Sequence, residues 1–307
     1  MAKNEELKKE NIQAVRTYFY QGGTWTKNTL SEKTGLSLAG TTNVLQELQE
    51  ADEIIYIGDA ASTGGRKSKE YRLNVDFCHL ATVYCCRKAE QYYFQLQIFN
   101  LHQEELQKVT VFSDEGSLDD FQKTLAIVKK DPKVKFLAVS IPGVCRHGKV
   151  DACDFPLLVQ VDLGKIIRRK CGIPYVIEND VNTACVSYAS HDRTLKNIAL
   201  IYQPACEYIG CGILIDGRLY NGTHHEAGEM KQLGERKMPP QEDLKRSIRA
   251  VHAVMDPQKI IWCSEIVKEL DDPFPDLIHI NEIDSEIQNG LYQIGMHQLL
   301  KLRKEEE

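Results

Sequence analysis

The chain has 307 residues, of which 42% are hydrophobic and 27% charged, a composition typical of globular proteins with more than one domain. Its apolar runs are far too short to cross a bilayer, and residues 1–10 lack the apolar stretch of a signal peptide. We therefore expect a cytoplasmic protein with no membrane partner. The net charge of −6 argues at first against a nucleic-acid partner.

The first periodic segment is a predicted helix over residues 5–20, in which apolar side chains recur at near-helical spacing. Gly22 and Gly23 predict the end of this helix. Thr26 is predicted to cap a short second helix and Ser37 a third. Consecutive short helices of this kind are typical of a helix-turn-helix.

A predicted hairpin follows, with strands at residues 54–57 and 70–73 on either side of a glycine-rich tip at 62–67. The order helix, helix, turn, helix and hairpin is that of a winged helix-turn-helix, so residues 1–73 are predicted to be a DNA-binding domain. These residues carry ten Lys or Arg and ten Asp or Glu, which leaves the whole negative excess on the rest of the chain. A basic tip on a neutral domain suits a small DNA-binding unit.

Side chains at the start of the third helix and at the hairpin tip are predicted to contact DNA. Small and hydroxyl-bearing side chains let a helix lie close in the major groove, where Asn can pair with adenine. An arginine on a glycine-rich tip can enter the narrow minor groove of A·T-rich DNA. The alternatives are a protein-docking module for the helices and a solvated linker for the tip. The predicted DNA-binding residues are Ser37, Ala39, Gly40, Thr41, Thr42 and Asn43 of the helix, and Arg66 and Lys67 of the tip.

From residue 74 onward, predicted strands alternate with predicted helices, which is the pattern of an α/β domain. Most of the ten cysteines lie in apolar runs and are expected to be small buried hydrophobic residues. Strands are predicted at residues 80–85, 94–99, 108–112, 136–141, 175–177, 198–202, 208–215, 259–263 and 277–280, and helices at 118–130, 163–171, 181–190 and 283–304.

Several motifs along the chain occur together in one family. They are residues 62–67 with 71–74, Ser140–Val144, Glu178–Asn182, Gly210–Gly222 and Ala227–Glu229. In this combination the chain resembles the ROK family (repressors, open reading frames and kinases), whose regulators include N-acetylglucosamine and xylose repressors. The resemblance implies two ribonuclease-H-like lobes, related to actin and hexokinase, with a ligand in the cleft between them.

The expected fold is therefore a winged helix-turn-helix followed by a two-lobed α/β ROK domain over residues 74–307. Lobe one is expected at about 74–190 together with the C-terminal helix, and lobe two at about 191–285. The resemblance implies that the ligand-binding residues are Gly143, Asn179, Asp180 and Glu229. Carboxylate and amide groups suit a polyol, because each hydroxyl both donates and accepts hydrogen bonds. The alternative is that Asn179 and Asp180 only cap the helix that follows them.

Departures from the family pattern bear on catalysis. Family kinases hold ATP phosphates with an Asp-x-Gly-Gly-Thr loop, because glycines expose backbone N–H groups to the anion. The corresponding segment here, Tyr84–Lys88, contains no glycine, and the second phosphate loop is replaced by Cys206–Tyr208, where Glu207 would repel a phosphate. We therefore expect no enzymatic activity and no ATP cofactor, although Asp180 stands where the family places its general base.

The family zinc site is also absent from the sequence. Ala227–Glu229 is followed by Met230–Gln232 instead of a histidine, and the next cysteine is Cys263. Both the zinc ligands and two family sugar contacts are missing, so no metal is expected. His224 and His225 are adjacent and cannot easily face one ion, which favours a surface loop.

These features together predict a homodimeric transcription regulator, a repressor of carbohydrate metabolism. Its expected partners are a palindromic, A·T-rich double-stranded DNA operator and a small effector, either a sugar or a sugar phosphate. Two alternatives stay open: a sugar kinase with unusual phosphate loops, and a dimeric regulator that binds no ligand.

Overall fold

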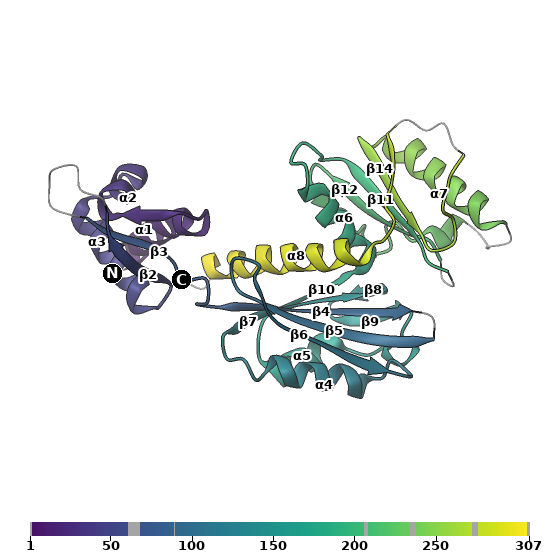
Figure 1. Ribbon diagram of the computed structural model, residues 1–307, viewed down its shortest axis with the longest axis horizontal. Coiled ribbons are helices and arrows are strands. Elements are labelled where there is room, and N and C mark those ends of the chain that lie inside the picture. The colour runs from purple at the N-terminus through teal and green to yellow at the C-terminus, as the bar shows by residue number, and fades with distance from the viewer. Residues whose placement is uncertain are drawn as a thin grey trace. The chain divides into compact units, whose positions relative to one another are not determined.

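The computed structural model describes residues 2–60, 68–88, 90–205, 208–233, 238–271 and 276–305. The chain forms two compact units (Figure 1). The first unit consists of Met1–His79, Asn100–Glu104 and Leu300–Glu307, and the second of Leu80–Phe99 and Glu105–Leu299. No helix in the described part of the chain is both long and apolar enough to cross a membrane.

The first unit contains three helices and a three-stranded antiparallel sheet of order β1-β3-β2. The predicted caps are confirmed: the side chains of Thr26 and Ser37 accept hydrogen bonds from the backbone N–H groups of Thr29 and Gly40. The elements are α1 (Ala2–Tyr20), β1 (Thr24–Thr26), α2 (Lys27–Thr34), α3 (Leu38–Glu50), β2 (Ile54–Asp59) and β3 (Lys69–Leu73).

One apolar face of each helix forms the core of this unit. Val15, Phe19, Leu30 and Leu48 are at most 1% exposed. Their spacing matches the helical periodicity of the sequence, because residues three and four apart share a face. This core fixes which side of α3 is buried and which side faces outward.

A buried ion pair also stabilises the first unit. Arg16 of α1 donates two hydrogen bonds to the carboxylate of Glu53, at 2.6 and 2.9 Å, and Glu53 is only 1% exposed. Arg303, in the last turns of the C-terminal helix, donates to the same carboxylate at 3.4 Å and lies over the ring of Phe77. The C-terminal end, assigned to lobe one from the sequence, thus contributes to the first unit.

The second unit begins with the five-stranded sheet β10-β7-β4-β5-β6. Figure 1 shows α4 and α5 side by side against one face of this sheet. Its elements are β4 (His79–Lys88), β5 (Gln91–Phe99), β6 (Glu105–Ser113), α4 (Leu118–Val128), β7 (Val134–Ile141), α5 (Leu163–Cys171) and β10 (Tyr175–Asn179). A two-stranded hairpin of β8 (Gly143–Arg146) and β9 (Lys149–Cys153), which was not among the predicted elements, follows β7.

A second five-stranded sheet, of order β13-β12-β11-β14-β15, completes the unit. Its elements are α6 (Asp180–Ser190), β11 (Ile198–Gln203), β12 (Gly210–Ile215), β13 (Arg218–Leu219), α7 (Pro240–Met255), β14 (Lys259–Ser264) and β15 (Leu277–His279), and α8 (Asp284–Glu305) ends the chain. β12 and β13 pair antiparallel across a tight turn, and α7 was not among the predicted elements.

The two sheets share one strand order. The first strand of each sheet, β4 or β11, is the middle one of the five. The next two strands along the chain extend the sheet antiparallel on one side of it, and the last two extend the sheet on the other side. This repetition is invisible in the sequence, and it agrees with the expected pair of related lobes. The helices α6 and α8 pack very closely, since a Cβ added at Gly290 would lie 1.8 Å from the carbonyl oxygen of Thr183.

The parallel pairing of β7 and β10 positions the site. Ile141 is opposite Asn179 in this ladder, so both strands end at the same edge of the sheet. Loops that leave the carboxyl ends of neighbouring parallel strands converge, which is why ligand sites recur at such edges. The segment after β7 and the start of α6 after β10 therefore meet.

Candidate functional site

The start of α3 presents most of the predicted DNA-binding side chains to solvent. Ser37, Ala39, Thr42 and Asn43 are exposed, and Gly40 is half-buried. Arg66 and Lys67, the predicted contacts of the hairpin tip, lie outside the described residues. The exposed set is compact, because it occupies about two turns at the start of the helix.

Thr41 corrects one expectation. Its side chain is 0% exposed and donates a hydrogen bond to the carbonyl oxygen of Ser37 at 3.0 Å. Each residue turns a helix by about 100°, so Thr41 shares the core face with Val44, Leu45 and Leu48 while its neighbours face outward. Thr41 is a packing residue and not a DNA-facing one.

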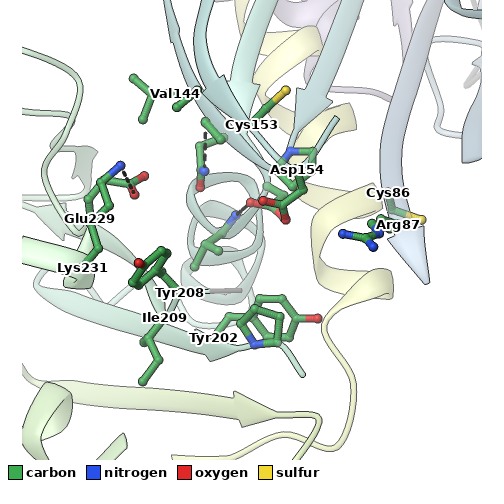
Figure 2. Close-up of a pocket in the computed structure, with 18 of the residues that line it drawn as sticks. Cys86, Arg87, Val144, Cys153, Asp154, Tyr202, Tyr208, Ile209, Glu229 and Lys231 are labelled. Carbon is green, nitrogen blue, oxygen red and sulfur yellow. Dashed lines mark hydrogen bonds and ion pairs between the residues drawn. The ribbon is translucent and has the colours of Figure 1, made fainter. Parts of the chain in front are cut away.

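The second unit contains a cavity of about 340 Å³ between its two sheets (Figure 2). All four residues predicted to bind ligand, Gly143, Asn179, Asp180 and Glu229, line it. Residues separated by up to 86 positions in the sequence are thereby brought into one site. Lining residues that the sequence did not single out include Asp154, Tyr202, Ile209, Lys231 and Glu265.

Asn179 caps α6, as the structural alternative expected. Its side-chain oxygen accepts from the backbone N–H of Asn182 at 3.1 Å, and its Nδ2 donates to the carbonyl oxygen of Gly143 at 3.1 Å. The amide therefore links the start of α6 to the turn after β7. Asn179 both caps α6 and lines the cavity, because it lies where β10 ends and α6 begins.

Asp180 lies at the inner wall of the cavity and is 8% exposed. Burial, reinforced by the charge of Asp154, raises the pKa of its carboxyl group from an ordinary 3.8 to about 7. One oxygen accepts a hydrogen bond from the Val181 N–H at 2.8 Å. A carboxyl group with such a pKa can exchange a proton near neutral pH.

Beside the cavity, a polar network joins the two halves of the second unit. Glu178 at the end of β10 accepts hydrogen bonds from Asn182 at 2.9 Å and from Asn221 at 3.2 Å. Asn182 also donates to the side chain of Asn221, which follows β13. The stretch Glu178–Asn182 was recognised as a motif in the sequence, but nothing local indicated its partner 39 residues later.

Gly143 is required by close packing of the β8–β9 hairpin. A Cβ added there would lie 2.2 Å from the carbonyl oxygen of Ala152 and 2.5 Å from the Cα of Cys153. Such distances cannot be relieved by rotating a side chain, because both neighbours are backbone atoms. Gly143 thus allows the hairpin to fold back over the cavity wall.

Comparison with protein families matches residues 92–242 to the ROK family. The chain contains a ROK family domain. Curated relatives are named xylose repressors: that of Staphylococcus xylosus is 25% identical over 241 residues, 74% of this chain and 61% of its own length. That of Bacillus subtilis strain 168 is 21% identical over 248 residues, 73% of this chain and 60% of its own length. The chain matches about three fifths of the length of these relatives.

Solved structures share the fold of the ROK domain. A ROK family transcriptional regulator described as a homologue of the E. coli MLC protein superposes with a TM-score of 0.59 at 17% identity, over 96% of this chain and 88% of that chain. A ROK hexokinase from Thermus thermophilus superposes with a TM-score of 0.56 at 12% identity, over 73% of this chain and 99% of that chain. The fold is therefore common to regulators and sugar kinases.

Two side chains of Tyr84–Lys88, the segment that corresponds to the phosphate loop of family kinases in the sequence, bond to the carboxylate of Asp284. Tyr84 donates to Asp284 at 3.1 Å, and Lys88 forms an ion pair with the same carboxylate. In this chain β4 continues as a strand through Lys88, so the backbone groups of this segment belong to the antiparallel pairing with β5.

A second carboxylate, that of Glu265, lines the cavity. It accepts hydrogen bonds from the Tyr202 hydroxyl and from the backbone N–H of Ala205, both at 2.9 Å. The N–H of Ala205 is thus bonded to an anion of the protein itself. Of the predicted replacement loop, Cys206 and Glu207 lie outside the described residues, and Tyr208 is 55% exposed.

Within the described ranges, no three His, Cys, Asp or Glu side chains are grouped closely enough to hold a metal ion. His224 and His225 are exposed in the loop before Ala227, as expected for a surface segment. Five of the nine described cysteines are buried and four are half-buried, so the expectation of buried cysteines holds in part. Burial raises the pKa of the Cys86 and Cys153 thiols at the cavity to about 11, which disfavours the reactive thiolate.

Proposed function

We propose that this protein is a DNA-binding transcription regulator, a repressor of carbohydrate metabolism whose ROK domain binds a sugar effector without phosphorylating it. The observation that carries this proposal is the first unit, in which three helices and an antiparallel sheet leave the start of α3 exposed. In the proposal, residues 1–73 are a winged helix-turn-helix and α3 enters the major groove.

The coverage of the two structural neighbours supports this assignment. The ROK regulator aligns with 96% of this chain, whereas the ROK hexokinase aligns with 73%. The difference of 23% of the chain, about 70 residues, is about the length of residues 1–73, a segment that a sugar kinase does not need. The curated relatives that match are also named repressors.

The proposed DNA contacts are made by Ser37, Ala39, Thr42 and Asn43 in the major groove, with Arg66 and Lys67 in a flanking minor groove. A homodimer would place two copies of α3 on the half-sites of a palindromic, A·T-rich operator. Phosphate contacts make such binding sensitive to salt, because neutralising phosphates releases counterions.

Fluorescence anisotropy with labelled DNA from upstream of the protein's own gene tests the proposal over a series of salt concentrations. Asn43→Ala is expected to weaken specific binding by about 1–3 kcal/mol. Gln49→Ala, an exposed change at the other end of α3, is the matched control and should leave affinity unchanged. Affinity that is insensitive to salt, or equal for both variants, would contradict the proposal.

The proposed effector site is the cavity lined by Gly143, Asn179, Asp180 and Glu229. A ligand that binds only the folded protein raises its melting temperature by mass action. Thermal-shift measurements with sugars therefore test this part of the proposal. If no sugar stabilises the protein, a dimeric regulator that binds no ligand becomes the better assignment.

A sugar kinase is the second candidate, favoured by the position of Asp180 and by its pKa of about 7. Glu265 weighs against a kinase, because its carboxylate already accepts the hydrogen bond of the Ala205 N–H and would repel an ATP phosphate placed there. A coupled ATP assay on hexoses and amino sugars decides between them. Turnover that is abolished in Asp180→Asn would overturn the non-catalytic assignment.

A further inference from the structure

A strongly basic surface lies where the helices α4 and α5 end, and Figure 1 shows these helices side by side. Residues 129–135 and 168–175 hold seven cations and a single carboxylate, that of Asp131. All seven cations are exposed, in a chain whose net charge is −6. The α4–α5 basic surface consists of Lys129, Lys130, Lys133, Lys135, Arg168, Arg169 and Lys170. This concentration of positive charge is local and runs against the overall composition.

The two segments adjoin in the structure, although they are far apart in the sequence. The Cys171 thiol at the end of α5 donates to the carbonyl oxygen of Leu125, in the last turn of α4, at 3.7 Å. Burial raises the pKa of this thiol, and the nearby charge of Lys129 opposes the rise. The strands that follow, β7 and β10, pair in parallel, and the N–H of Leu137 donates to the carbonyl oxygen of Pro174 at 3.1 Å. The cations therefore form one surface at the start of these strands.

This surface is separate from the cavity of the ROK domain. The cavity lies at the carboxyl ends of β7 and β10, whereas the α4–α5 basic surface lies at their amino ends. Lys135 and Ile141 are six residues apart on β7, which corresponds to about 20 Å along a strand. No residue of the surface lines the cavity. A ligand in the cavity and a partner on this surface can therefore bind at the same time.

Most of these cations have no carboxylate partner. Within the described part of the chain, four of them form no ion pair: Lys129, Lys130, Arg169 and Lys170. Arg168 donates to the Tyr175 hydroxyl at 2.8 Å and lies over its ring, and neither contact neutralises its charge. The C-terminal dipoles of two helices amount to about one negative charge in total, so they balance only a fraction of this set. The surface thus carries a positive excess that the described residues around it do not neutralise.

The chemistry of the surface favours a nucleic-acid backbone over a protein or a membrane. A stable protein interface has an apolar core, and a helix that lies on a membrane has an apolar face. No large hydrophobic side chain is exposed in residues 121–135 or 163–175, all of which are described. Tyr175 is the only aromatic residue in 129–135 and 168–175, too few to stack the bases of a single strand. Lysine and arginine without these features are typical of contacts to duplex phosphates.

We propose that the α4–α5 basic surface binds the sugar-phosphate backbone of double-stranded DNA. This inference rests on the proposed function of the chain as a DNA-binding regulator, and it adds a second contact, made by the ROK domain. Duplex DNA carries one negative charge per about 1.7 Å of its axis, so a surface with this many cations can neutralise several phosphates. Phosphate contacts carry no sequence information, so the surface adds affinity for operator and unrelated DNA alike.

Fluorescence anisotropy of the full chain over a series of salt concentrations tests the inference, with the upstream duplex and an unrelated duplex of equal length. The variant combines Lys130→Gln, Arg169→Gln and Lys170→Gln. It should lower the magnitude of the slope of log K against log salt by about 2–3, since each phosphate contact contributes about 0.9. The change in slope should be the same for both duplexes, because the contact is to the backbone.

The matched control removes the same charge elsewhere in the second unit. Arg193→Gln, Arg218→Gln and Lys268→Gln together replace three exposed cations, so an effect of net charge alone would be equal in the two triple variants. The control should keep the wild-type slope. Thermal unfolding reports whether the surface variant folds. If it melts early, Lys129→Gln with Lys130→Gln leaves α5 unchanged and should lower the slope by about 1–2.

The outcomes separate this inference from the proposed function. An unchanged salt slope in the folded surface variant, or an equal loss in the control, overturns the inference alone if Asn43→Ala still weakens binding to the upstream duplex. Binding to phosphatidylserine vesicles that the surface variant loses, with an unchanged salt slope for DNA, would assign the surface to a membrane instead. If the full chain binds neither duplex, the proposed function is overturned and the inference falls with it.

Discussion

Replacing Glu53 should destabilise the first unit far more than an exposed charge would. Its carboxylate is 1% exposed and accepts two hydrogen bonds from Arg16, which is itself 5% exposed. Glu53→Ala leaves the Arg16 guanidinium buried without this partner, a change that costs about 3–5 kcal/mol. Glu53 is also 3.4 Å from Arg303, whose side chain is 20% exposed, and losing this contact should add about 1 kcal/mol or less to the destabilisation.

Denaturant unfolding of the full chain measures this loss, with DNA binding as a second readout. A domain is stable by only about 5–15 kcal/mol, so Glu53→Ala should populate an unfolded first unit at low denaturant and abolish DNA binding. Glu47→Gln is the control, because its pair with Lys8 is exposed on both sides (62% and 42%) and is worth about 0–1 kcal/mol. If the two variants lose the same stability, the buried pair does not stabilise the unit as reasoned.

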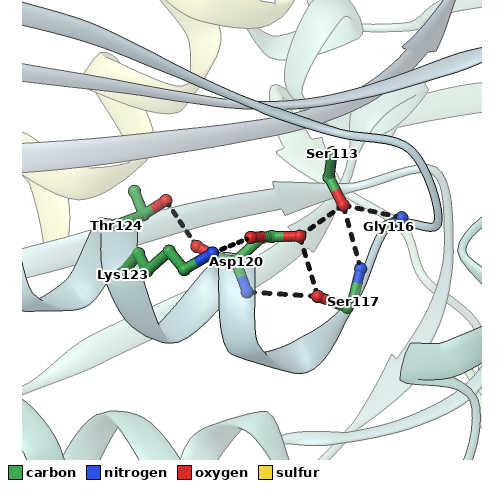
Figure 3. Close-up of polar contacts among 6 residues, drawn as sticks. All are labelled: Ser113, Gly116, Ser117, Asp120, Lys123 and Thr124. Atoms are coloured by element: carbon green, nitrogen blue, oxygen red, sulfur yellow. Dashed lines mark hydrogen bonds and ion pairs between the residues drawn. The ribbon is translucent and has the colours of Figure 1, made fainter.

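Three further changes probe the ROK domain. Asp120 pairs with Lys123 and accepts hydrogen bonds from Ser113 and Ser117, and together these lower its pKa from 3.8 to about 2 (Figure 3). The ionised Asp120 therefore contributes about 1 kcal/mol to the free energy of unfolding above pH 4, and this contribution is lost toward pH 2. Acid titration of the Asp120→Asn variant should show no such loss. Asp180 has a raised pKa, so the free energy of unfolding should fall as pH rises from 4 to 7, and Asp180→Asn should gain stability by about 2–4 kcal/mol at pH 8. Gly290→Ala should lose about 2 kcal/mol or more in thermal unfolding, because of the clash between α8 and α6, whereas helix propensity alone would favour alanine.

Local features were predictable from the sequence because their causes are local. The caps at Thr26 and Ser37 depend on hydrogen bonds to residues three positions away. The strands and most helices followed from the spacing of apolar residues, which sets the face that each element buries. The hairpin of β8 and β9 was missed because its strands are short. The helix α7 was missed although Leu244, Ile248 and Val251 recur in it at helical spacing.

The resemblance to the ROK family also named candidate cavity residues before any geometry was known. Gly143, Asn179, Asp180 and Glu229 belong to separate motifs, and the sequence alone does not show that they line one cavity. It gave no reason to include Asp154, whose charge acts on Asp180 across the cavity. That effect depends on distance in space, which sequence separation does not report.

The amino-acid sequence by itself determined most element types, the helix caps, the family motifs and the absence of a glycine-rich phosphate loop at Tyr84–Lys88. The tertiary structure alone decided that the Thr41 side chain is buried in the core. It also decided that Arg303 and Arg16 both donate to Glu53, and that Glu265 accepts a hydrogen bond from the N–H of Ala205. The physical reason is the same in each case. Burial and electrostatic contacts are set by which surfaces pack together, and that packing joins residues far apart along the chain.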